Sequence, residues 1–158
     1  LHKMFEQYGE VSNSKTLAKH IVQHRSHQSV QTIAQFKSMI SAVVKGNPNK
    51  YLAQVFQALR IEVNDEMGAL KEMLLQLTSL LKQGGRVAII TFHSLEDRMV
   101  KNFFRNGSFE EEPENPFETI VKQKDWKLIT KKPITATEEE LKKNPRSRSA
   151  KLRVAERF

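Results

Sequence analysis

The stretch GGRVAIITFHSLEDRMVK, residues 84–101, decides the fold of this 158-residue chain. Two glycines precede an uninterrupted apolar run, Val87–Ile90, which Thr91 and Phe92 extend. A strand without polar alternation is typical of a parallel sheet whose two faces are covered by helices. We therefore predict a strand over 86–92, buried on both faces, in a fold of the α/β class.

Helical patterns flank this strand. Before it, Asn64 can begin a helix with acidic residues in the first turn, and Gly84 with Gly85 can end it. After it, Ser94 and Asp97 are spaced as a capping box, so the strand should pass through His93 directly into the next helix. The first helix carries its apolar residues at helical spacing: Met67, Leu70, Met73, Leu74, Leu77, Leu80 and Leu81.

The C-terminal third is predicted to add strands to the sheet. Residues 106–116 are acidic and interrupted by proline, which predicts a surface loop. Strands are expected near 126–129 and 152–154, pairing antiparallel at a sheet edge, with a short helical turn capped by Thr137 and Glu140 between them.

Residues 1–62 show helical spacing throughout and no strand pattern. Asn13 or Ser14 can cap one helix and Thr32 another, and the break at residues 46–48 separates them from a third apolar stripe. We predict two domains: an all-α domain at 1–62, and part of an α/β domain at 63–158.

The predicted α/β domain lacks strands. A buried parallel strand needs parallel neighbours, yet only one such strand is predicted. We expect either a partner chain or an upstream half of the domain to supply the rest. Leu1 stands where Met would begin a chain and no leader follows, so we expect an excerpt. The unpaired strand edge predicts a homodimer or higher assembly.

Charge points to a polyanionic partner, with nucleic acid the leading candidate. Lys and Arg number 26 against 18 Asp and Glu, for a net charge of +8. Residues 1–62 and 121–153 are basic, and the segment between 106 and 120 is acidic. The chain has no cysteine, and no apolar run approaches the roughly 18 residues that span a bilayer, so we expect a cytoplasmic protein without a membrane partner.

The carboxyl end of the strand is the expected ligand edge of an open α/β sheet, and it carries His93 and Ser94. Capping alone could also explain Ser94 and Asp97. The histidines at 20, 24 and 27 share one helix face, but a single element without carboxylates is a poor zinc site, so no metal is expected. Gly84 and Gly85 precede a strand, which is a turn and not a phosphate-binding loop.

The stretch NPRSRSAKLRVAER, residues 144–157, concentrates arginines. Guanidinium groups with nearby serines suit phosphate contacts that position a polynucleotide without reading its bases. The alternative is that these are the ordinary charges of a solvated loop and an edge strand.

Three blocks together resemble one family: FQALRIEVNDEMGAL (56–70), residues 84–101, and residues 144–157. The chain is similar to the bacterial small-subunit ribosomal RNA (cytosine-N4)-methyltransferase H family, also called the MraW type. The early stretch YGEVSNSKTLAKHIVQHR (8–25) is similar to the family's helical region. The match is loose between 106 and 140.

The resemblance implies a doubly wound, Rossmann-like methyltransferase domain interrupted by an inserted helical domain that helps to recognise RNA. It implies S-adenosylmethionine as cofactor and a cytosine amine of 16S ribosomal RNA as substrate, with the small ribosomal subunit as partner. The family's cofactor-binding residues precede the position that matches Leu1, so no cofactor-binding residue is expected in this chain, and we expect the chain alone to be inactive.

Two groups of site residues follow from the resemblance. The base pocket is expected to be shaped or supported by His93, Ser94, Glu96 and Asp97. RNA contacts are expected from Arg60, Asn64, Arg98, Lys101, Arg146, Arg148 and Lys151, although helix packing and capping could also explain Arg60 and Asn64. The competing functions are a non-catalytic RNA- or ribosome-binding module and a DNA amino-methyltransferase.

Overall fold

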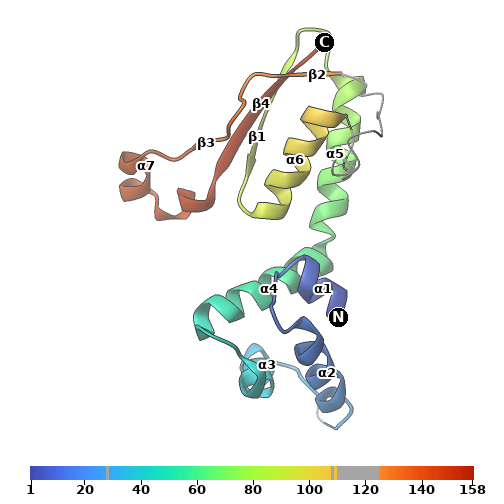
Figure 1. Ribbon diagram of the computed structural model, residues 1–158, viewed down its shortest axis with the longest axis vertical. Coiled ribbons are helices and arrows are strands. Elements are labelled where there is room, and N and C mark those ends of the chain that lie inside the picture. The colour runs from blue at the N-terminus through green and yellow to red at the C-terminus, as the bar shows by residue number, and fades with distance from the viewer. Residues whose placement is uncertain (28, 108, 110–124) are drawn as a thin grey trace, which may run out of the picture. The chain divides into compact units, whose positions relative to one another are not determined.

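The computed structural model describes residues 1–27, 29–107, 109 and 125–158. These residues form two compact units, Leu1–Glu66 and Met67–Phe158. The first is all helical, and the second combines helices with a small sheet (Figure 1). The structure therefore belongs to the α/β class that the sequence predicts.

The first unit packs its helices around one apolar core. Its helices are α1 (His2–Gln7), α2 (Ser14–Arg25), α3 (Ile33–Ile40), the short 3₁₀ helix η1 (Ser41–Val43) and α4 (Pro48–Asn64). The core contains Met4, Phe5, Val11, Leu17, Ile21, Ile40, Tyr51, Val55 and Ala58.

Two of the predicted helix starts behave differently. Thr32 caps α3 as expected, in a capping box with Gln35. Asn13 holds the N-cap position of α2, but its side chain makes no capping bond. Its Oδ1, the atom that would cap the helix, accepts instead from the Tyr51 hydroxyl at 3.0 Å, and its amide N–H donates to the Val43 carbonyl at 2.8 Å.

The second unit begins with a long helix that starts later than predicted. Asn64 is the last residue of α4, and Asp65 adopts a left-handed conformation (φ 48°). The elements from there on are α5 (Glu66–Leu80), β1 (Arg86–Thr91), α6 (Ser94–Asn106), β2 (Trp126–Leu128), β3 (Ile134–Thr135), α7 (Glu138–Lys143), the 3₁₀ helix η2 (Pro145–Ser149) and β4 (Lys151–Arg157).

The acidic segment predicted as a surface loop lies largely outside the described residues. Of its first residues, Asn106 ends α6, and Gly107 closes the helix in a left-handed conformation (φ 70°). Its main-chain N–H bonds the Phe103 carbonyl, as is common at helix ends.

The sheet has the order β1-β4-β2, and the short strand β3 also pairs with β4. All strand pairs among the described residues are antiparallel, so the parallel pairing expected for 86–92 is not seen here. The antiparallel pairing predicted for the two C-terminal strands is confirmed, but β4 is a central strand and not an edge.

Helix α6 packs on one face of this sheet, as Figure 1 illustrates. The core of this unit contains Leu74, Val100, Phe103, Phe104, Trp126 and Ala155. The other face is open: Ile90 is 58% exposed and Ile134 54%, and both pair with Leu152. The prediction that the first strand is buried on both faces is therefore wrong for the described residues, which cover a single face.

No helix among the residues that the structure describes is long and apolar enough to cross a membrane.

Candidate functional site

The turn after β1 is built by His93 and Glu96. His93 stays extended (φ −136°, ψ 166°) and is the N-cap of α6, where its Nδ1 accepts from the Glu96 N–H at 3.3 Å. Oε2 of Glu96 accepts in return from the N–H groups of Phe92 (2.8 Å) and His93 (3.2 Å). The capping box predicted from Ser94 and Asp97 therefore lies one residue earlier, because the chain leaves the extended conformation only after His93.

The turn fixes the imidazole of His93 through a hydrogen bond at Nδ1 and brings its other nitrogen close to the Glu96 carboxylate. With Nδ1 accepting a bond, a neutral ring carries its proton on Nε2, which lies 3.4 Å from Oε1 of Glu96. The His93 side chain is only 8% exposed, and that of Glu96 is 24% exposed. The pair is thus oriented by local geometry before any ligand arrives.

The Asp97 side chain points away from this turn and towards strand β4. Its carboxylate accepts two bonds from the Arg153 guanidinium, at 2.7 and 3.2 Å, and one from Nζ of Lys151 at 3.2 Å. Burial alone would raise the pKa of Asp97, but its bonds to Arg153 and Lys151 and their charges outweigh this and lower it. Asp97 is therefore an anionic anchor rather than a helix cap.

Arg153 is buried, contrary to the expectation from sequence. The arginines of residues 144–157 are predicted to be either phosphate contacts or charges of a solvated loop and edge strand, but the Arg153 side chain is 7% exposed and faces Asp97. On β4 it shares the covered face with Ala155, whereas Leu152 and Val154 lie on the other. The helices α5 and α6, which pack on one side of the sheet, decide which face of β4 is covered.

The C-terminal arginines separate into two kinds. Arg146 and Arg148 lie on η2 and are exposed, and neither forms an ion pair with another residue that the structure describes. Ser147 between them is buried and bonds to the Asn144 carbonyl over 2.8 Å. Lys151 is 40% exposed and shares Asp97 with Arg153. The two exposed guanidiniums remain available to an anion.

The other predicted RNA contacts lie on helices. Arg98 and Lys101 are exposed on α6. In the first unit, Arg60 bonds the Glu66 carboxylate at 2.8 and 3.1 Å, and Asn64 reaches the same carboxylate at 3.4 Å. Arg60 and Asn64 thus meet at the Glu66 carboxylate, whose negative charge offsets much of the positive charge of Arg60.

Phe92 is a site feature that the sequence analysis did not single out. It immediately precedes the His93–Glu96 turn and is 56% exposed. Its place at the end of an apolar strand predicted burial, so an exposed aromatic at the ligand edge is visible only in the structure. Exposed aromatic rings at such positions can stack on unpaired bases.

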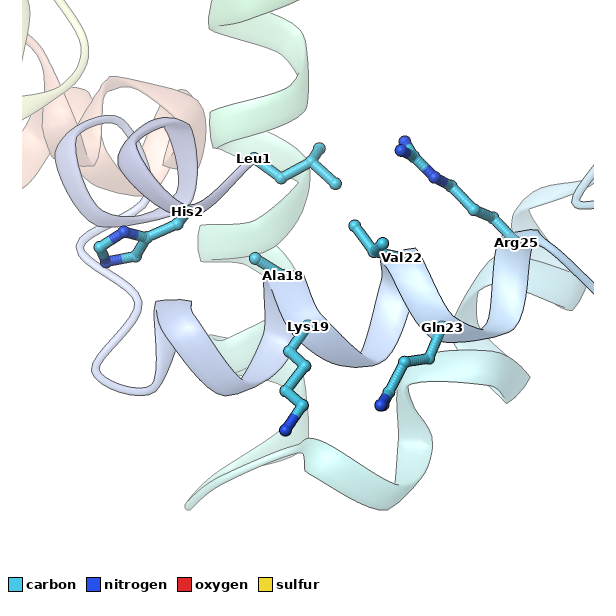
Figure 2. Close-up of a pocket in the computed structure, with 7 residues that line it drawn as sticks. All are labelled: Leu1, His2, Ala18, Lys19, Val22, Gln23 and Arg25. Atoms are coloured by element: carbon cyan, nitrogen blue, oxygen red, sulfur yellow. The ribbon is translucent and has the colours of Figure 1, made fainter.

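Two concavities of the first unit are lined by none of the predicted site residues. One is open and lined by Leu1, His2, Ala18, Lys19, Val22, Gln23 and Arg25. Figure 2 shows Val22 and Arg25 on the side of Leu1, and Lys19 and Gln23 pointing the other way. The other lies beside the start of α4 and is lined by Glu10, Ser12, Lys45, Gly46, Asn47, Lys50, Tyr51 and Gln54.

The histidines of α2 have structural partners. Nε2 of His20 lies 2.7 Å from the Met39 carbonyl, and Nδ1 of His24 lies 2.9 Å from the His20 carbonyl. One nitrogen of each ring is thus engaged with the main chain.

Comparisons with known proteins identify similarity along the whole chain. The profile of the MraW methylase family matches residues 1–158. A relative from Azobacteroides pseudotrichonymphae, named ribosomal RNA small subunit methyltransferase H, is 54% identical over 98% of this chain and 51% of its own length. Proteins of the same name from Parabacteroides distasonis and Bacteroides thetaiotaomicron are 49% and 50% identical, over 99% of this chain and 52% of theirs. The chain spans about half the length of these relatives, and it belongs to the MraW methylase family.

Proposed function

We propose that this chain is part of an S-adenosylmethionine-dependent methyltransferase that modifies N4 of a cytosine in small-subunit ribosomal RNA. The observation that carries the proposal is the family match along all 158 residues, together with relatives of about 50% sequence identity that are named ribosomal RNA small subunit methyltransferase H. The chain would contribute a helical RNA-recognition domain, inserted into a doubly wound domain, and the C-terminal half of that domain.

Methylation of a cytosine amine requires a partly buried pocket that fits the base. The exocyclic amine of cytosine is a weak nucleophile because its lone pair is delocalised into the ring, so the site must orient it and accept developing charge. His93 and Glu96 already hold each other in place at the end of β1, and Ser94 begins the helix beside them. We assign these three residues to the base pocket and Asp97 to its support.

RNA would be positioned chiefly through its phosphates. Arg146 and Arg148 are exposed and form no ion pair within the described part of the chain, which suits them to phosphate contact. Arg98, Lys101 and Lys151 belong to the same unit, and Arg60 with Asn64 would contribute from the helical unit. A target base must be unpaired or flipped out to reach the pocket, and the exposed ring of Phe92 offers it a stacking surface.

The described residues do not fit as the binding site for S-adenosylmethionine. The glycine pair lies before β1, where Gly84 N–H bonds the Arg157 carbonyl (2.8 Å) and Arg157 N–H bonds the Gly85 carbonyl (2.9 Å). These bonds continue the pairing of β1 with β4, and among the described residues no glycine-rich loop follows the carboxyl end of a strand. We place the cofactor site in the half of the relatives that this chain does not match, and propose that the chain alone does not turn over.

The proposal is tested with a chimera that joins this chain to the unmatched half of the Azobacteroides pseudotrichonymphae relative. Labelled S-adenosylmethionine is supplied with unmodified small ribosomal subunits or duplex DNA, and the product nucleoside is identified by mass spectrometry. We expect N4-methylcytidine in the RNA alone. Transfer to another atom or preferentially to DNA would refute the proposal, and RNA binding without transfer would favour a non-catalytic binding module.

Isothermal titration of the 158-residue chain tests the placement of the cofactor site separately. We expect no binding of S-adenosylmethionine at micromolar concentration. Tight binding would show that the cofactor site lies within this chain.

A further inference from the structure

The turn that carries His93 and Glu96 is bonded at both of its ends to the same segment of β4, residues 151–153. Before the turn, Thr91 pairs with Lys151 in the sheet, and its Oγ1 donates to the Lys151 carbonyl at 3.3 Å. After the turn, Asp97 takes two bonds from Arg153 and one from Lys151. Residues 92–96, which comprise the turn and the first residues of α6, are therefore attached on both sides to residues 151–153.

The Asp97–Arg153 pair is well suited to fix the orientation of the first turn of α6. A bidentate carboxylate–guanidinium pair tolerates few arrangements, since both bonds must align in one plane. Both side chains are nearly buried, at 12% and 7% exposure, so water competes little for them. The packing of α6 is supplied by its apolar residues, whereas the charge pair selects the rotation of the first helical turn.

That rotation determines where the pocket residues lie. Asp97 directly follows Glu96, and Glu96 and His93 share the capping box of the same turn. If Asp97 shifts on Arg153, Glu96 and then His93 must move with it. A displacement of about 1 Å can cost a hundredfold in rate when reacting groups must be aligned.

We propose that Arg153 is a positioning residue, which acts through Asp97 to hold the His93–Glu96 turn in the geometry that the methyl-transfer site requires. The inference rests on the proposed function for its catalytic consequence. The positioning itself is a property of this chain and can be measured without any substrate.

The first experiment is hydrogen exchange on the 158-residue chain. Arg153→Met and Asp97→Asn should speed exchange at the amides of Phe92, His93 and Glu96 by about tenfold, with less change at the centre of α6. Arg153→Lys should lie between these variants and the parent. The control is Arg86→Met, which removes an exposed ion pair with Glu156 (2.8 Å) at the other end of the same strand pair and should leave the turn unchanged.

The second experiment measures catalysis in the chimera described above. The double variant Asp97→Leu/Arg153→Met removes both charges, so no unpaired charge is left buried and folding should be largely restored. We expect its kcat to fall by about tenfold while KM for the small subunit stays within about twofold. Arg153→Lys should recover part of kcat.

The outcomes separate the two proposals. A uniform rise in exchange across α6, or a double variant with the parent's kcat, would show that the pair only stabilises the fold and would overturn the positioning role. An inactive parent chimera would refute the proposed function, and the exchange pattern would still decide whether the pair holds the turn. If Arg153→Met does not fold, Arg153→Lys and the double variant give the same comparison.

Discussion

The hydroxyl of Tyr51 donates a hydrogen bond of 3.0 Å to Oδ1 of Asn13, which precedes it by 38 residues. The amide of Asn13 in turn donates to the Val43 carbonyl, so this side chain connects the start of α2 to η1 and α4. Tyr51 is 3% exposed, and its burial raises the pKa of the phenol. One polar group thus ties together three segments of the helical unit.

Tyr51→Phe is expected to destabilise the helical unit by about 1–2 kcal/mol, because it leaves a buried acceptor without its donor. Chemical denaturation of the chain, followed by circular dichroism, measures this. Tyr8→Phe is the control, since Tyr8 is only partly buried and its hydroxyl forms no hydrogen bond with the residues that the structure describes. Equal effects of the two changes would contradict the role assigned to the Asn13 contact.

His93 offers a test that separates capping from pocket chemistry. His93→Ala removes the cap of α6 and should cost about 1 kcal/mol, whereas His93→Asn keeps a side chain that caps helices well and should cost less. In the chimera, both variants should lose most methyl transfer, since neither presents an imidazole. Full activity of His93→Asn would restrict His93 to a structural role.

The local sequence pattern predicted the strands and helices around β1 better than it predicted which face of each strand is buried. The strand, the helices beside it and the antiparallel C-terminal pair could be read from apolar spacing and turn residues. Leu152 and Val154 alternate with Arg153 on β4, and the covered face of the strand is the one that carries Arg153 and Ala155. Asp97 makes burial of Arg153 possible, and no local signal connects two residues 56 positions apart.

The candidate site shows the same limit. Spacing placed a capping box in the right turn but on Ser94 and Asp97, because Ser and Asp are the common capping residues. His93 and Glu96 fill those roles instead, which releases Asp97 for its long-range partner. The displacement by one residue depends on where the backbone leaves the extended conformation, and sequence patterns locate such boundaries poorly.

Asp97 should make stability depend on acid pH. Its pKa is lowered on folding, so its pairing stabilises the fold above the pKa of the unfolded chain, about 4, and this is lost as the pH falls through the folded value. Asp97→Asn should cost about 3 kcal/mol at neutral pH and progressively less below about pH 4. Denaturation curves from pH 7 to pH 2 measure the difference. A constant difference would contradict an ionised Asp97.

The exposed arginines of η2 should contribute phosphate contacts that can be counted. Arg146→Ala and Arg148→Ala should each weaken RNA binding and reduce the slope of log affinity against log salt by about 1. Lys143→Ala is the matched control, because its ammonium lies 2.7 Å from Glu139 and is already paired. Fluorescence anisotropy with fragments of small-subunit RNA at several salt concentrations measures the slopes. Unchanged slopes in both arginine variants would remove them from the interface.

The open face of the sheet predicts self-association of the chain. Ile90 and Ile134 flank Leu152 there, and β1 pairs only with β4 among the described residues, so both an apolar face and a strand edge are exposed. Light scattering should show a dimer or larger species, and Ile90→Lys should shift it towards monomer by placing a charge on that face. Gln76→Lys adds the same charge at an exposed position of α5 and should not. A monomer at high concentration, or equal effects of the two substitutions, would show that this face needs no second copy to cover it.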